Sequence, residues 1–168
     1  MKRSLLFLSV CSVLMIGLWS VSAAPANFAG TWSLDKSKSE GLQGPMASVD
    51  QMWVVTQEAK TLSLEIKFSG GQREMAPQKR TYNLDGSPTE VQMGGQMPGT
   101  ATLTAKWKDD GKTLELTSKR NVNIQGNEAT ITTTEHWELD NGGKTLKVHR
   151  KSESPRGTQE SKLVLVKQ

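Results

Sequence analysis

The chain has 168 residues, of which 23% are charged and one, Cys11, is a cysteine, and its formal net charge is +4. A chain of this length forms one domain with a sizeable core. Basic and acidic residues alternate along each segment, whereas nucleic-acid binding favours a basic stripe with stacking aromatic side chains. We therefore expect one globular domain and no nucleic-acid partner.

The N-terminus has the pattern of a secretory signal peptide. A basic start at Lys2 and Arg3 precedes an apolar run, and small residues follow up to Ala23. The run is interrupted and shorter than the roughly 20 apolar residues of a membrane span. We expect cleavage after Ala23, which removes Cys11 and leaves residues 24–168 as a disulfide-free domain with a charge of about +2. A retained N-terminal anchor is the alternative.

Beyond residue 24, apolar and polar residues alternate with a period of two, and no long segment shows a helical period. Such alternation is typical of strands with one dry face and one wet face. The predicted strands are Phe28–Leu34, Asp50–Gln57, Thr61–Phe68, Lys79–Leu84, Thr89–Met93, Ala101–Lys108, Thr113–Ile124, Glu128–Leu139, Thr145–Ser152 and Thr158–Val166. One helical turn is predicted at Asp35–Glu40.

Turn residues separate neighbouring strands. Asp85–Gly86, Asp110–Gly111 and Gly126–Asn127 suit two-residue hairpin turns, and Asn141–Gly143 suits a longer one. Neighbour-to-neighbour pairing without crossover helices predicts an all-β, antiparallel up-and-down meander of about eight to ten strands that closes into a β-barrel. A two-sheet β-sandwich is the alternative.

The first predicted strand carries a family resemblance. Its sequence Phe28-Ala29-Gly30-Thr31-Trp32-Ser33-Leu34, with the following Asp35-Lys36-Ser37-Lys38-Ser39, resembles the opening Gly-x-Trp strand of lipocalin-like (calycin) barrels, in particular small exported bacterial ones. The resemblance covers a dozen residues. It implies that Gly30 and Trp32 are structural, that the tryptophan packs across one end beneath a basic residue from a late strand, and that the open end takes a small apolar ligand. The later lipocalin signatures and the usual disulfide are missing.

Hairpin geometry predicts which residues face each other inside the barrel. The expected partners are Trp107 with Leu114, Ala105 with Leu116, Ala101 with Arg120, Arg120 with Thr133, Ser118 with Glu135, Trp137 with Val148 and Glu135 with Arg150. Every pairing keeps the apolar residues on one face, as a correct register must. Glu135 then lies opposite Arg150 and diagonal to Arg120, so charged side chains point into the barrel.

Buried charges are costly unless they are paired, so this inward cluster needs an explanation. One hypothesis is an anion-binding site in which Glu135 offsets one guanidinium while another binds a carboxylate or phosphate. Arg80 and Tyr82 share the inward face, and the pair is chemically similar to the one with which intracellular fatty-acid carriers hold a carboxylate. The candidate ligand-binding residues are Arg80, Tyr82, Arg120, Glu135 and Arg150. The alternative is a structural ion-pair network.

Six inward apolar residues could line a cavity or simply fill the core: Leu64, Ile66, Leu103, Leu116, Ile131 and Val148. No catalytic motif, metal site or cofactor is predicted. We therefore expect an exported, periplasmic or secreted, non-catalytic protein that carries or senses a small amphipathic or anionic molecule. The alternative is an envelope protein-interaction or assembly module with a filled core.

The sequence leaves two side-chain orientations open, that of the last strand and that of Trp53. A three-residue loop at 155–157 would turn Val164 and Val166 inward, whereas a two-residue loop would turn Leu163 and Leu165 inward. The orientation of Trp53 is equally ambiguous.

Outside the barrel, His136 is expected directly across from His149 and near Glu138. Two histidines on a wet hairpin face are usually solvated, and zinc binding by this set is the alternative.

Overall fold

The computed structural model describes residues 24–71, 75–93, 99–124 and 127–168, so the predicted signal peptide at 1–23 lies outside the described residues. About two thirds of the described residues lie in strands, and the helices are short: α1 (Pro45–Ser48) and the 3-10 turns η1 (Asp109–Gly111) and η2 (Asn141–Gly143). The strands are β1 (Gly30–Leu34), β2 (Asp50–Gln57), β3 (Thr61–Ser69), β4 (Gln78–Asn83), β5 (Thr89–Met93), β6 (Gly99–Lys108), β7 (Thr113–Ile124), β8 (Asn127–Asp140), β9 (Thr145–Ser154) and β10 (Gly157–Lys167). All ten strands predicted from the alternation are confirmed.

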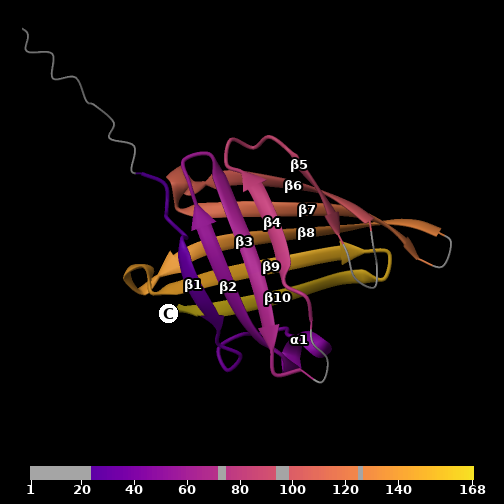
Figure 1. Cartoon of the computed structure of the whole chain (residues 1–168), viewed down its shortest axis with the longest axis horizontal. Helices are drawn as coiled ribbons and strands as arrows, with labels where there is room; N and C mark the ends of the chain where they lie inside the picture. Colours follow the sequence, from indigo (N-terminus) through magenta and orange to yellow (C-terminus); the bar gives the residue numbers. More distant parts are fainter. Residues whose placement is uncertain (1–23, 72–74, 94–98, 125–126) are drawn as a thin grey trace, which may run out of the picture.

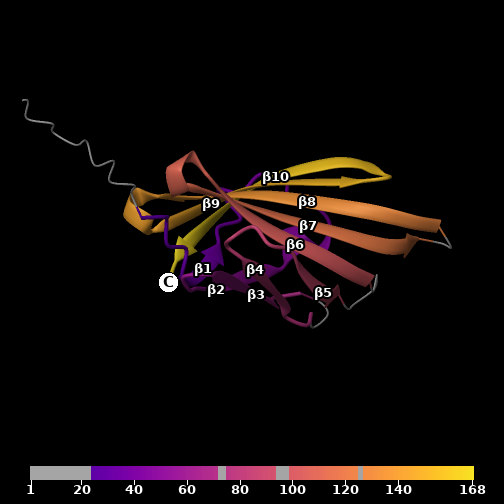
Figure 2. The same cartoon turned by 90° about the horizontal axis from the view of Figure 1, so that it is seen from above.

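The strands form one antiparallel sheet in the order β4-β3-β2-β1-β10-β9-β8-β7-β6-β5. β1 pairs with both β2 and β10, so the first and last strands join the two halves of the meander. Figures 1 and 2 show β1–β4 crossing in front of the longer strands β6–β10, with the interior between them. The fold is a nearly closed up-and-down barrel, which confirms the barrel and not the sandwich.

The barrel is open between β4 and β5. Here the predicted Asp85–Gly86 hairpin is wrong, because in the described chain β4 pairs with β3 and β5 pairs with β6. The Asp85 carboxylate accepts hydrogen bonds from the backbone N–H and hydroxyl of Ser87, at 2.9 and 2.6 Å, which closes a local turn. Gly86, at φ 86°, lies against the backbone carbonyl of Ala105 on β6. The next strand, β5, therefore pairs with β6 and not with β4.

Two of the three predicted hairpin registers are confirmed. Trp107 faces Leu114 across β6 and β7, although the loop holds four residues, and Glu135 faces Arg150 across β8 and β9. The β7–β8 register is wrong by two residues: Glu135 faces Leu116, and the turn falls at residues 125–126, outside the described part. A slip of two residues leaves every side chain on its original face, so hydrophobic alternation could not detect it.

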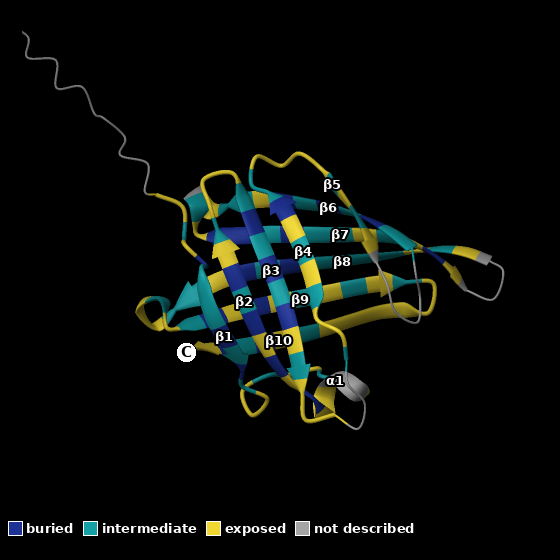
Figure 3. Cartoon of the chain, in the orientation of Figure 1, coloured by how far each residue is buried: buried dark blue, intermediate teal, exposed yellow. Residues whose placement is uncertain are grey.

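The structure also settles both open orientations. Ser154 pairs with Gly157, so the last hairpin has a two-residue turn and Leu165 points inward. Leu165 is 0% exposed, whereas Val166 is 37% exposed. Trp53 is fully buried and faces Trp32 across β1 and β2. Figure 3 shows the resulting bands of buried and exposed residues along β2, β3 and β4.

Aromatic side chains fill the end of the barrel where the β6–β7 and β8–β9 turns lie. Phe28 stacks on Trp107 with ring centroids 6.0 Å apart and meets the edge of Trp137 at 5.8 Å. Trp53 lies 5.5 Å from Trp137. Aromatic pairs at these separations add to the burial of large apolar surfaces, so this end is a packed core.

The residues that follow the predicted signal peptide are bound to this closed end. The Ala26 N–H donates to the Gly111 carbonyl at 2.8 Å. Gln57 accepts from the Phe28 N–H at 2.9 Å and donates to the Ala26 carbonyl at 3.0 Å. The segment before β1 is therefore part of the folded barrel.

The resemblance implied a tryptophan beneath a basic residue, and such a pair is present. The Lys167 ammonium of β10 lies 5.2 Å from the Trp32 ring centroid, a cation–π distance, and Trp32 Nε1 donates to the Phe28 carbonyl at 3.0 Å. Gly30 has φ 146°, and a Cβ there would lie 2.8 Å from Lys167 Cε. Glycine at position 30 therefore leaves room for the lysine stem.

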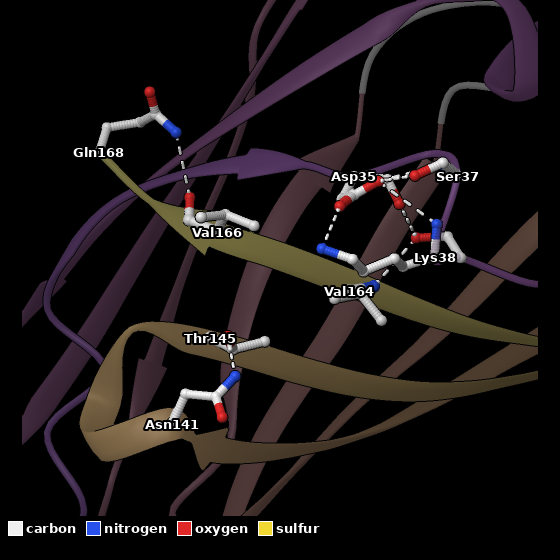
Figure 4. A network of polar contacts seen from close by, with 9 residues as sticks. Asp35, Ser37, Lys38, Asn141, Thr145, Val164, Val166 and Gln168 are labelled. Atoms are coloured by element: carbon white, nitrogen blue, oxygen red, sulfur yellow. Dashed lines mark hydrogen bonds and ion pairs between the residues drawn. The ribbon is translucent and has the colours of Figure 1, made fainter.

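The chain after β1 is tied to β10 by a polar network (Figure 4). The Asp35 N–H donates to the Val164 carbonyl at 2.8 Å, and the Val164 N–H donates to Ser39 Oγ at 3.0 Å. Hydrogen bonds from Ser37 and Lys38 lower the pKa of Asp35 to about 2. The helical turn predicted at Asp35–Glu40 is a single hydrogen-bonded turn, and the helix forms later, at α1.

Candidate functional site

The charged residues predicted to face the interior lie on four strands of the barrel: β4, β7, β8 and β9. The β8–β9 register sets Glu135 directly opposite Arg150. Arg80 and Tyr82 come from β4, in the other half of the barrel, and reach the same place across the interior. We call Arg80, Tyr82, Arg120, Glu135 and Arg150 the arginine cluster.

Glu135 is the centre of this cluster and is only 2% exposed. Its Oε1 accepts from Arg150 Nε at 2.9 Å, and its Oε2 accepts from Trp137 Nε1 at 2.8 Å. Burial would raise the pKa of Glu135, but the charges of Arg150 and Arg80 and the two hydrogen bonds outweigh it, so that the pKa lies below its ordinary value. Glu135 is therefore an ionised carboxylate inside the barrel.

Arg150 is held by an ion pair and by an aromatic ring. Its Nε bonds Glu135, and its guanidinium carbon lies 5.7 Å from the centroid of the Trp53 ring. The Arg150 side chain is 22% exposed, so solvent reaches the cluster. Only Nε is used in the ion pair. Among the described residues, the terminal nitrogens of Arg150 have no hydrogen-bond acceptor.

Arg80 is the less satisfied arginine. Its Nη1 lies 4.0 Å from Glu135 Oε1, at the limit of an ion pair, and its Nη2 donates to Gln78 Oε1 at 3.2 Å. Arg80 Nε is buried and, among the described residues, has no hydrogen-bond partner. Burial raises the pKa of the neighbouring Tyr82 phenol, against the opposing effect of the Arg80 charge. Tyr82 is therefore neutral and can donate a hydrogen bond.

Arg120 does not lie where the sequence analysis expected it. It faces Ile131, and Glu135 lies opposite Leu116, four residues away along β7, which corresponds to about 13 Å. The predicted diagonal contact between Arg120 and Glu135 is therefore wrong. Burial and the like charge of Arg80 lower the pKa of Arg120, which indicates that these two guanidinium groups repel each other. No ion pair of Arg120 is present within the described chain.

The six apolar residues proposed as cavity lining have different surroundings. Leu64, Ile66, Leu103, Leu116 and Val148 are at most 3% exposed and belong to the packed core. Ile131, beside Arg120, is half-buried. Two surface hollows, of about 420 and 590 Å³, lie against the β6–β7 and β8–β9 turns and against the outer face of β6; neither touches the arginine cluster.

The predicted histidine pair is present on the outer face, where His136 faces His149 with ring centroids 6.5 Å apart. Their carboxylate neighbours differ from the expected Glu138. His136 Nε2 lies 3.0 Å from Glu115, and His149 Nε2 lies 3.6 Å from Glu160. Glu138 accepts a hydrogen bond from Thr113 instead. In the described ranges no group of three or more potential ligands is arranged to hold a metal ion.

Three partners of the cluster were not predicted from the sequence: Trp137, Gln78 and Trp53. Trp137 lies two residues after Glu135 on the same strand face, so its hydrogen bond to Glu135 could have been predicted from alternation alone. Gln78 bears the same relation to Arg80. The contact between Trp53 and Arg150 could not be predicted from alternation, because β2 and β9 are not neighbours in the sheet.

No protein-family model matches the chain, and no curated protein matches it in sequence. Solved structures do resemble it. The ileal bile acid-binding protein of zebrafish, complexed with cholic acid, aligns with a TM-score of 0.53 and 11% identity over 84% of this chain and 98% of its own. A secretary abundant heat soluble (SAHS) protein from Ramazzottius varieornatus aligns with a TM-score of 0.53 and 12% identity, over 83% and 94%. The chain therefore shares its overall β-barrel fold with these two proteins.

No helix in the described part of the chain is long and apolar enough to cross a membrane.

Proposed function

We propose that this protein is a non-catalytic binding barrel that carries or senses a small amphipathic anion, whose charged group binds at the arginine cluster. The observation that carries the proposal is an excess of positive charge on the inward face. Arg80 and Arg150 share one carboxylate, Glu135, and Arg120 on the same inward face of β7 has no ion pair among the described residues. Unpaired charge in a partly buried site is unfavourable, and a bound anion would relieve it. The like charges of Arg80 and Arg120, and an Arg80 Nε without a hydrogen-bond partner among the described residues, support an anion as the ligand.

The apolar part of the ligand would lie against half-buried side chains near the cluster. Phe68 on β3, Val91 on β5 and Ile131 on β8 share the inward face, are neither fully buried nor fully exposed, and lie opposite Gln51, Ala101 and Arg120, respectively. Such a surface suits an aliphatic or sterol-like body with a single charged end. The similar zebrafish barrel is complexed with cholic acid, which is an amphipathic anion of this kind.

We further propose that the protein is exported, to the periplasm or the medium, and belongs with the small bacterial lipocalin-like proteins. The basic and apolar pattern of residues 1–23 supports export. The Trp32–Lys167 stack and the close approach at Gly30 support the lipocalin-like assignment.

Native mass spectrometry of protein purified from its exporting host tests the function. We expect a small-molecule adduct in the wild type that is lost in Arg120→Gln, because Arg120 has no structural ion pair in the described chain. Lys119→Gln is the matched control, since this lysine is exposed on the outer face of the same strand. A wild-type protein that carries no adduct and binds no added cholate or fatty acid would contradict the proposal. Co-purification of an envelope protein with such an empty barrel would favour the interaction module.

A further inference from the structure

One row of inward residues, next to Glu135 and Arg150, is almost entirely polar. It lies two residues farther along β8 and β9 than this ion pair, about 7 Å away from the aromatic end of the barrel. Residues directly opposite each other on antiparallel strands share one face of the sheet, and Leu103 in this row is 0% exposed in the interior. The successive partners across β5 to β10 are Thr89, Leu103, Ser118, Thr133, Ser152 and Gln159. We call Thr89, Ser118, Thr133 and Ser152 the hydroxyl row.

The hydroxyl row has unused hydrogen-bonding capacity. Within the described chain, the one hydrogen bond between its members joins Thr133 to Ser152, at 3.3 Å. Ser118, Thr133 and Ser152 face the interior and are half-buried, so solvent reaches this part of the barrel. Thr89 Oγ1 is buried and has no hydrogen-bond partner among the described residues. Because a hydroxyl both donates and accepts, and buried polar atoms are almost always satisfied, this row suits a polar part of a bound molecule.

We propose that the ligand is a hydroxylated carboxylic acid, an inference that rests on the proposed function. Its carboxylate binds Arg80 and Arg150, and its hydroxyl groups bind the hydroxyl row. Arg80, Arg150 and Glu135 leave one positive charge, which a single carboxylate matches. The hydroxyl row then selects the body of the ligand. A plain hydrocarbon would leave Thr89 Oγ1 unsatisfied and would displace water from the other hydroxyls without replacing its hydrogen bonds.

Isothermal titration calorimetry with two pairs of carboxylates tests this inference. Cholate has more hydroxyl groups than lithocholate on the same ring body, and a mid-chain hydroxydodecanoate has one more than dodecanoate. We expect the more hydroxylated member of at least one pair to bind about fivefold more tightly, the ratio that one additional hydrogen bond produces. Burial of apolar surface alone would give the opposite order in both pairs. A preference in the ring pair only assigns a sterol-like body, and one in the chain pair only assigns an aliphatic body.

Adjacent threonines on β8 provide a matched pair of variants. Thr133 lies on the inner face and Thr134 on the outer face, and both are half-buried. Thr133→Val should remove the about fivefold preference for the hydroxylated ligand, whereas Thr134→Val should leave it unchanged. Ser118→Ala should reduce the same preference and serves as the second inner-face variant. Thr89→Val adds a readout without ligand, because losing a buried hydroxyl that has no partner should leave the urea midpoint unchanged or raise it.

The outcomes separate this inference from the proposed function. Equal or tighter binding of the less hydroxylated member in both pairs would overturn the hydroxylated ligand and leave the amphipathic binding function standing. A preference that survives both Thr133→Val and Ser118→Ala would contradict the assignment to the hydroxyl row. A lower urea midpoint in Thr89→Val would mean that this hydroxyl is satisfied within the protein, which contradicts its role in the row. Absence of binding by all four carboxylates would overturn both the inference and the proposed function.

Discussion

Replacing Glu135 by glutamine removes one charge from the centre of the barrel and nearly preserves the shape of the side chain. The substitution leaves Arg150 and Arg80, with side chains only 22% and 15% exposed, without their shared carboxylate. Breaking a buried ion pair by removing one partner costs about 3–5 kcal/mol, and partial solvation of both guanidinium groups lowers this cost. We expect the free energy of unfolding to fall by about 2–4 kcal/mol.

Urea denaturation followed by tryptophan fluorescence measures this loss. With a slope of about 2 kcal/mol/M, the unfolding midpoint should fall by roughly 1–2 M at pH 7 while the slope stays unchanged. Glu128→Gln is the matched control, because Glu128 is exposed on the same strand, and its effect should stay within about 0.5 kcal/mol. A loss of less than about 0.5 kcal/mol for Glu135→Gln would refute the view that this carboxylate holds the arginines in place.

The pH dependence gives a second check on the same residue. The folded-state pKa of Glu135 is lowered, so its ionisation stabilises the folded protein at pH values above the ordinary glutamate value of 4.5. This contribution is lost as the pH falls from that value through the lower folded-state pKa. The difference in stability between the wild type and Glu135→Gln should therefore shrink below about pH 4. A difference that grows on acidification would contradict the assigned direction.

Three further sets of substitutions test other parts of the structure. Gln57→Leu breaks two hydrogen bonds to the segment before β1 and should cost about 1–3 kcal/mol, with faster amide exchange at residues 26–28. Leu165→Ala should cost about 2–5 kcal/mol in urea unfolding, whereas Val166→Ala should cost under about 1 kcal/mol; the reverse order would mean that the last strand is turned over. Gly30→Ala should lower the free energy of unfolding by about 1–3 kcal/mol, because the new Cβ meets Lys167 Cε and because φ at position 30 is positive. Adding Lys167→Ala removes the contact with the lysine but not the backbone strain. The double variant should therefore recover only part of the lost stability.

The sequence by itself determined the strands and the faces of most of their side chains. Period-two alternation depends only on the pleat of a strand, so it placed Glu135 and Arg150 on the inner face before any pairing was known. Turn residues at two hairpins then made the β6–β7 and β8–β9 registers predictable. The opposition of Glu135 and Arg150 follows from these local signals.

Only the tertiary structure decided how far the sheet closes into a barrel and which side chains contact each other across its interior. The β7–β8 slip and the opening at Asp85–Gly86 are compatible with the same alternation, so local pattern could not separate them from the predicted hairpins. Arg80 reaches Glu135 from a strand that is not its neighbour in the sheet. Such cross-barrel contacts depend on the curvature and closure of the whole sheet, and no short segment of the sequence encodes them.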